Sequence, residues 1–187
     1  MVSREEAILG IKSLLEYLGE DTTREGLIDT PERFLKSWEQ YWGVGYTSDI
    51  TEHIKTFNTD NRSDIILIKN IPLYSHCEHH IAPIIGKVHI GYLSSGKVLG
   101  LSKFKRIIDV FARRLQIQER LTVQIADSLQ EILKPLGLAV VVEAEHLCMS
   151  SRGVQVQNST TKTSIMYGRF RDEVILKNEF LNLLKDN

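Results

Sequence analysis

Two helical patterns follow each other closely in the middle of the chain, with strand-like runs on both sides of the pair. The first pattern spans about 102–114, with Ser102 as its expected N-cap, and the second spans about 118–134. Each repeats apolar residues at helical spacing. The strand-like runs lie at 65–73, 87–93, 138–144, 153–158 and 163–170, and a closing helix is expected at 173–185. This order of elements predicts an α+β fold.

The first 64 residues predict a helical arm rather than part of the sheet. Ser3 followed by Glu6 has the form of a capping box, and Thr30-Pro31 has the form of a second helix start. Residues 43–64, which include the polar run TDNRSD, predict an exposed connection. We therefore expect an N-terminal helical arm and connection at 1–64 and a main domain at 65–187, together forming one functional unit.

Composition narrows the classes of protein that the chain could represent. The 187 residues include 42% hydrophobic and 25% charged residues, which is typical of globular proteins. A formal net charge of -1 argues against general binding to nucleic acids or membrane surfaces. No apolar run approaches the roughly 18 residues of a membrane span, and the acidic N-terminus is unlike a signal peptide. The sequence predicts a cytoplasmic protein that binds neither nucleic acid nor membranes.

The two cysteines and four of the six histidines gather at two distant points. The run CEHH at 77–80 separates Cys77 and His80 by two residues, and the run HLC at 146–148 carries Cys148. These three side chains would leave a fourth metal position for water, as in catalytic zinc sites, whereas a structural zinc site needs four protein ligands. The pattern therefore predicts an open metal site.

A plainer interpretation of the same residues exists. A cysteine in mid-chain is often a small buried hydrophobe, and a surface histidine often has no chemical role. If the metal site is present, the two remaining histidines of these runs, His79 and His146, are candidates for proton transfer, because imidazole titrates near neutral pH. Nothing comparable distinguishes His53, His76 or His89.

Positive charge is concentrated between residues 102 and 120, where six basic residues accompany two acidic ones. Lys103 and Arg106 share one face at the start of a predicted helix, whose free N–H groups and dipole favour a phosphate. Arg152 could add a further guanidinium. A solvated helix face would explain this charge equally well. No P-loop or Rossmann glycine motif is present, so neither kind of nucleotide site is supported.

Several segments taken together resemble one family, GTP cyclohydrolase I. The matching segments are DTP at 29–31 with Arg33 and Lys36, CEHH at 77–80, GLSKFKRI at 100–107, RRLQIQERLT at 113–122, EAEHLCMSSRGVQ at 143–155 and TSIMYGRF at 163–170. The resemblance covers residues 5 to 185 in one register. CEHH alone would be weak support, but these motifs in this order are highly specific.

The resemblance implies a role for each matching residue. The implied ligands of one Zn²⁺ per subunit are Cys77, His80 and Cys148, and the implied catalytic residues are His79, His146 and Gln118. The implied substrate contacts are Glu119 for the guanine edge, Ser102, Lys103, Arg106 and Arg152 for the ribose and triphosphate, and Arg33 and Lys36 for the triphosphate of a neighbouring subunit.

The implied reaction is hydrolytic opening of the guanine imidazole ring of GTP. Zinc-activated water attacks C8 while His79 protonates N7, formate leaves, and the ribose rearranges with the help of His146. The product is 7,8-dihydroneopterin triphosphate, in the first step of pterin and tetrahydrofolate biosynthesis. The triphosphate is not cleaved, so its contacts serve positioning.

The implied fold is the T-fold, an antiparallel sheet with two long helices on one face, here preceded by an N-terminal helical segment. The implied assembly is a homodecamer of two stacked pentamers, with active sites between subunits and GTP as substrate. An allosteric ligand and the downstream pathway stay open.

Two alternatives differ in class. A T-fold nitrile reductase would use a cysteine nucleophile and NADPH and would need no catalytic zinc. A non-catalytic, zinc-stabilised oligomer that binds purine nucleotides would keep the three ligands but would not need His79, His146 or Gln118.

Overall fold

The predicted helices of the N-terminal arm form as the sequence pattern indicates, in a computed structural model that describes residues 2–60 and 65–185. Helix α1 (Arg4–Tyr17) begins with the capping box, since Glu6 N donates to Ser3 Oγ and Ser3 N donates to Glu6 Oε2. Helix α2 (Thr30–Ser37) has Pro31 in its first turn and continues into the π-helical turn η1 (Trp38–Trp42). Ion pairs from Arg4 to Glu32 and Glu39 connect α1 to the second helical segment.

Contacts divide the chain into two compact units, Met1–Val44 and Gly45–Asn187. The division near Val44 falls at the start of the expected connection at 43–64, so most of that connection belongs to the second unit. The reason is that strand β1 (Thr56–Asn58) pairs with β4 (Lys97–Leu99) in a two-stranded sheet of the second unit. The two short helices η2 (Val44–Tyr46) and η3 (Ile50–His53) precede β1. Residues 61–64 of the expected connection lie outside the described residues.

A five-stranded sheet forms the centre of the second unit. Its strands are β2 (Ile66–Cys77), β3 (Pro83–Leu93), β5 (Leu115–Gln116), β6 (Gly137–His146) and β7 (Thr161–Gly168), in the spatial order β5-β2-β3-β6-β7. All neighbours are antiparallel except the short β5, which runs parallel to the end of β2. The strands therefore alternate in direction across most of the sheet.

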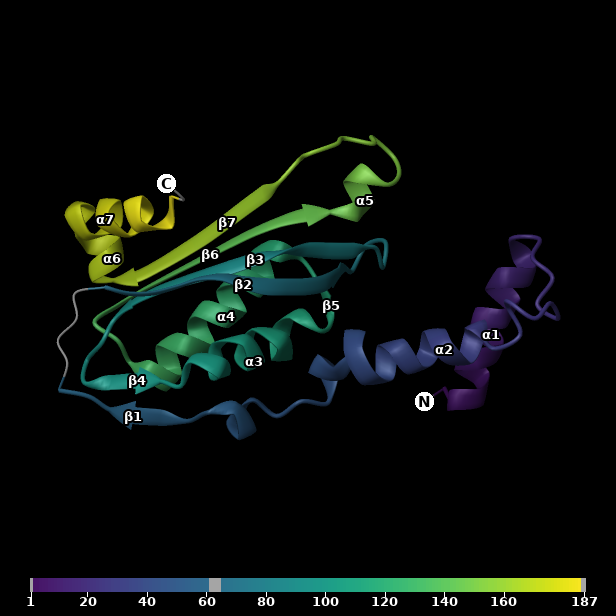
Figure 1. The fold of residues 1–187 in the computed structure, drawn as a ribbon, viewed down its shortest axis with the longest axis horizontal. Helices are drawn as coiled ribbons and strands as arrows, with labels where there is room; N and C mark the ends of the chain where they lie inside the picture. The colour runs from purple at the N-terminus through teal and green to yellow at the C-terminus, as the bar shows by residue number, and fades with distance from the viewer. Residues whose placement is uncertain (1, 61–64, 186–187) are drawn as a thin grey trace. The chain divides into compact units, whose positions relative to one another are not determined.

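Helices α3 (Leu101–Ala112) and α4 (Gln118–Leu133) cover one face of this sheet (Figure 1). Their apolar faces pack with alternate residues of the strands into the main core, which includes Val88, Phe104 and Ile125. The opposite face carries α6 (Arg169–Asp172) and α7 (Val174–Leu184) over a smaller core with Phe170 and Phe180. An antiparallel sheet with two long helices on one face confirms the expected T-fold.

Two local expectations were wrong. Residues 153–158 form turns instead of a strand, because Gly153, Gln155 and Asn158 all have positive φ angles that interrupt an extended chain. Helix α3 begins at Leu101 after an N-cap at Gly100, so Ser102 lies inside the first turn and does not cap the helix.

Candidate metal centre and active site

The first two metal-ligand candidates come from the end of β2 and the loop that follows it. Cys77 N donates to Ala82 O and Ile81 N donates to Cys77 O, each at 2.8 Å, which closes a tight loop between β2 and β3. Ile81 adopts a φ of +56°, which this closure requires. The loop is also tied to β5, because Glu78 N donates to Gln116 O. Cys77 and His80 are therefore held in a short, well-connected turn.

Strand pairing brings the third candidate to the same place. Ile84 at the start of β3 lies opposite His146 at the end of β6, and the short helix α5 (Leu147–Ser150) begins there. The ligand atoms of Cys77, His80 and Cys148 consequently lie within 4.8 Å of one another. The structure brings together the three residues that the sequence analysis selected as ligands.

The chemistry of this group fits a soft or borderline cation. Two sulfur atoms and one imidazole are a donor set that zinc accepts, with one coordination position left open. Burial, together with the neighbouring Cys77 thiol, raises the pKa of Cys148, while the charge of Arg152 opposes that shift. Two close thiols ionise together only beside a cation, because the thiolates otherwise repel each other.

The two further histidines flank this group. Nδ1 of the exposed His79 lies 3.7 Å from Cys77 Sγ. Nε2 of the half-buried His146 lies 2.7 Å from Oε1 of Gln118, the first residue of α4. Burial lowers the pKa of His146, and the carboxylate of Glu119 acts in the opposite direction. One end of the sheet thus combines the metal group with two imidazoles and an exposed carboxylate.

The basic residues between 102 and 120 separate into two groups. Lys105 and Arg113 pair with Asp109, and Arg114 donates to Gly45 O. Among the described residues, Lys103 and Arg106 have no ion-pair or hydrogen-bond partner. The same holds for Arg152, just beyond α5. These three cations are among those that the resemblance assigns to the triphosphate, whereas Lys105, Arg113 and Arg114 make contacts within the fold. Arg33, another residue in that assignment, pairs with Asp29.

The structure does not bring Ser102 and Lys103 to the metal group of the same chain. Ser102 and Lys103 lie in the first turn of α3, while β5, just beyond its other end, pairs with β2 at Cys77. Because a 12-residue helix is about 18 Å long, this end of α3 is distant from the metal group of the same chain. Arg33 and Lys36 lie on α2 in the first unit.

Sequence reasoning missed a contact that holds the ligand loop. The guanidinium of Arg120 forms an ion pair with Glu78, inside the CEHH run, and Arg120 Nε donates to Gln116 Oε1 at 3.0 Å. Arg120 therefore connects the start of α4 to the loop that carries Cys77 and His80. The sequence places the acidic Glu78 between the two ligand candidates of the loop. The separation of Glu78 and Arg120 along the chain, however, gives no sign that their side chains meet.

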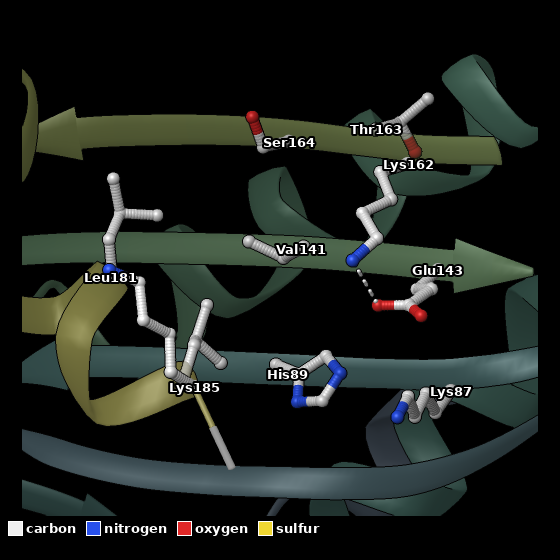
Figure 2. A pocket seen from close by; sticks show the side chains of 10 residues that line it. Lys87, His89, Val141, Glu143, Lys162, Thr163, Ser164, Leu181 and Lys185 are labelled. Carbon is white, nitrogen blue, oxygen red and sulfur yellow. Dashed lines mark ion pairs between the residues drawn. The ribbon is translucent and has the colours of Figure 1, made fainter. Parts of the chain in front are cut away.

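A cavity of about 480 Å³ lies on the other face of the sheet, beside α7 (Figure 2). Lys87, His89 and Glu143 line it, and Lys162 forms an ion pair with Glu143 at 2.9 Å. None of the predicted site residues lines this cavity. Among the described residues, no helix is long and apolar enough to cross a membrane.

These features define a class of protein: a T-fold chain with a Cys-His-Cys group that could hold a metal ion and two further imidazoles beside it. The sequence pattern of one family, GTP cyclohydrolase I, matches residues 8–185. The chain belongs to the GTP cyclohydrolase I family.

Curated relatives agree over nearly the whole chain. The GTP cyclohydrolase 1 of Allorhizobium ampelinum is 46% identical over 186 residues, covering 98% of this chain and 92% of the relative. "GTP cyclohydrolase 1 1" of Pseudomonas syringae pv. tomato is 52% identical and covers 92% of each chain. The enzyme of Thermoanaerobacter pseudethanolicus is 45% identical and covers 98% of each. The predicted activity is confirmed at this level: the chain is an enzyme of the first step of pterin biosynthesis, with GTP as substrate.

Proposed function

We propose that Cys77, His80 and Cys148 hold one zinc ion per subunit and that the surrounding side chains open the guanine imidazole ring of GTP. The convergence of these three ligand atoms within 4.8 Å is the observation that carries the proposal. Bound zinc would acidify a water molecule enough to supply hydroxide near neutral pH. The two thiols must stay reduced to act as ligands, which suits a cytoplasmic location.

In this proposal His79 and His146 each carry out a different proton transfer. His79 lies beside Cys77 and is exposed, so it can reach the purine and protonate N7 as the bond at C8 is attacked. His146 supplies and recovers a proton at the ribose, which helps the sugar ring open after formate has left. Separate donors suit a reaction with two hydrolytic steps and a rearrangement that gives 7,8-dihydroneopterin triphosphate.

Glu119 is our candidate for recognition of the guanine edge. Its exposed carboxylate lies in the first turn of α4, close enough to His146 to influence the pKa of that histidine. A carboxylate accepts two hydrogen bonds from adjacent N–H donors, and guanine presents N1–H and the 2-amino group side by side. Guanine would thereby be oriented with its imidazole ring toward the metal group.

The triphosphate contacts are assigned to Ser102, Lys103, Arg106 and Arg152, with Arg33 and Lys36 contributed by a neighbouring subunit. Lys103 and Arg106 have no partner among the described residues, which leaves them available to an anion. Because the first turn of α3 is distant from the metal group of its own chain, one GTP needs residues from more than one chain. This geometry supports active sites between subunits.

Exposed sheet edges support a closed ring of subunits, which active sites shared between chains require. In the part of the chain that the structure describes, β7 pairs on one side only, with β6, and β5 covers just the last two residues of β2. Two long unpaired edges invite pairing with another chain. We propose that such pairing closes a pentamer and that two pentamers stack as a homodecamer.

The proposal is tested by incubating purified, zinc-loaded protein with GTP. Formate and a pterin absorbance should appear together, and removal of the metal with a chelator should stop both until zinc is restored. Light scattering on the same sample should give the mass of ten chains. Unchanged GTP with a fully metal-loaded oligomer would exclude the enzymatic role. NADPH consumption with a nitrile substrate would indicate the reductase alternative instead.

Replacing Glu119 by glutamine should weaken recognition of guanine. The variant loses a charged acceptor, which is worth about 1.5–3 kcal/mol, so kcat/KM for GTP should fall about 10- to 150-fold. The loss should be smaller for inosine triphosphate, which lacks the 2-amino group. Glu131→Gln, on the same helix, is the matched control and should leave kcat/KM unchanged. Equal losses for both nucleotides would contradict a contact to the amino group.

A further inference from the structure

We propose that Gln118 is a positioning residue that fixes the neutral ring of His146 as the Nε2–H tautomer, so that His146 exchanges protons with the substrate through Nδ1 alone. The catalytic meaning of this inference rests on the proposed role of His146. The tautomer itself can be measured independently of that role.

The orientation of the Gln118 amide follows from its neighbours. Its Nε2 lies 3.2 Å from Val142 O and 3.0 Å from Thr161 O, and backbone carbonyl oxygens only accept hydrogen bonds. A flipped amide would place its own oxygen against both carbonyls. Gln118 is only 1% exposed, so water cannot relieve that repulsion. The nitrogen must therefore face β6 and β7.

Two threonine hydroxyls complete the arrangement. Thr122 Oγ1 donates to Gln118 O at 2.7 Å, and its oxygen lies 2.6 Å from Thr163 Oγ1. Because a hydroxyl has one proton, Thr122 has already used its own, and the bond between the two hydroxyls must be donated by Thr163. Thr163 Oγ1 is then an acceptor toward Gln118 Nε2, at 3.1 Å. The donor and acceptor roles of all these groups agree with one amide orientation.

This orientation determines which nitrogen of His146 carries the proton. The Gln118 oxygen faces His146 Nε2 at 2.7 Å and only accepts, so Nε2 must donate its hydrogen. Among the described residues, Nδ1 of His146 has no hydrogen-bond partner. In the neutral ring Nδ1 therefore carries the available lone pair.

The consequence for the reaction is a single path for the proton. Nδ1 takes a proton to give the imidazolium and returns the same proton to the sugar oxygen, while the Nε2 proton stays on the ring. The amide oxygen of Gln118 is too weak a base to remove the Nε2 proton. Because Gln118 is buried, it acts through His146 rather than through contact with GTP, which separates it from the catalytic residues His79 and His146.

The tautomer is measurable by nitrogen NMR of zinc-loaded protein labelled with ¹⁵N at histidine, at mildly alkaline pH where the ring is neutral. His146→Asn identifies the signals by their loss. Wild-type protein should show an N–H type signal for Nε2 and an unprotonated type for Nδ1. An Nδ1–H tautomer in the wild type would overturn the proposal without any further variant.

Gln118→Met tests the cause, because methionine keeps the length of the side chain and removes the amide. We expect the two tautomers to mix and kcat to fall about 10- to 100-fold, with the KM for GTP changed less than about twofold. Thr163→Val is the matched control, since both carbonyl acceptors remain and the amide keeps its orientation. It should retain the Nε2–H tautomer.

Two results of the Gln118→Met experiment would overturn the proposal. One is a Gln118→Met protein with an unchanged tautomer. The other is a raised KM with unchanged kcat, which would make Gln118 a substrate contact. Full activity in His146→Asn would instead overturn the proposed role of His146, while the nitrogen signals would still decide whether Gln118 sets the tautomer.

Discussion

Replacing Cys148 by serine should abolish metal binding and turnover together. Cys148 is one of the three ligand candidates found among the described residues, and a serine hydroxyl stays protonated where a thiol beside a metal is ionised. The remaining cysteine and histidine would bind zinc too weakly to keep it. We expect the metal content to fall from about one ion per chain to near zero and formate release to drop about 1000-fold or more. Elemental analysis and a formate assay measure the two effects.

Met149→Leu is the matched control for Cys148→Ser, because it changes the next residue of α5, which is 38% exposed. Its zinc content and activity should equal those of the unchanged protein. A Cys148→Ser protein that kept both zinc and turnover would show that Cys148 is not a ligand. A variant that kept zinc but lost activity would point to a catalytic rather than a ligating role for this thiol.

Replacing Gly86 by alanine should destabilise the sheet where it carries the active site. Gly86 on β3 lies opposite Ala144 on β6, and a Cβ atom there would come within 2.1 Å of Glu143 O and 2.6 Å of Ala144 Cα. These are backbone atoms of the neighbouring strand, so the strands themselves must separate. We expect a loss of about 3 kcal/mol or more in the free energy of unfolding, measured by urea denaturation.

The same substitution should also reduce activity. Ile84, two residues before Gly86, pairs with His146, so separating β3 from β6 also displaces this histidine and Cys148. Gly100→Ala is the control, because its Cβ would meet atoms no closer than 3.6 Å and its φ of -56° suits alanine. It should change stability by less than about 1 kcal/mol. Similar losses for both variants would mean that the close approach at Gly86 is not the cause.

Local sequence patterns were sufficient where neighbours along the chain decide the structure. The capping box at Ser3, the start of α2 at Pro31 and the two long helices follow from residues within a few positions of one another. The failed strand at 153–158 shows the limit of this reasoning. Its apolar residues alternate, but positive φ angles at Gly153, Gln155 and Asn158 turn the chain.

The residue types of the candidate site could be predicted from the sequence, but the contacts between its side chains could not. Cys77, His80 and Cys148 were found from spacing and from resemblance, and the structure brings them together. The ion pair of Arg120 with Glu78 and the buried position of Gln118 were not found. Both depend on how α4 packs against two strands, and no spacing in the sequence reports that packing.

By itself, the sequence determined which functional groups the site contains: two thiols, neighbouring imidazoles and a carboxylate at a helix start. It also determined local geometry, such as the short loop that holds Cys77 and His80 three positions apart. The tertiary structure decided what those groups do, because strand register places His146 and Cys148 beside that loop. It also decided which cations are free and which way the Gln118 amide points. The physical reason is range: capping and turn closure act over a few residues, whereas ligand convergence and amide orientation depend on hydrogen bonds between distant segments.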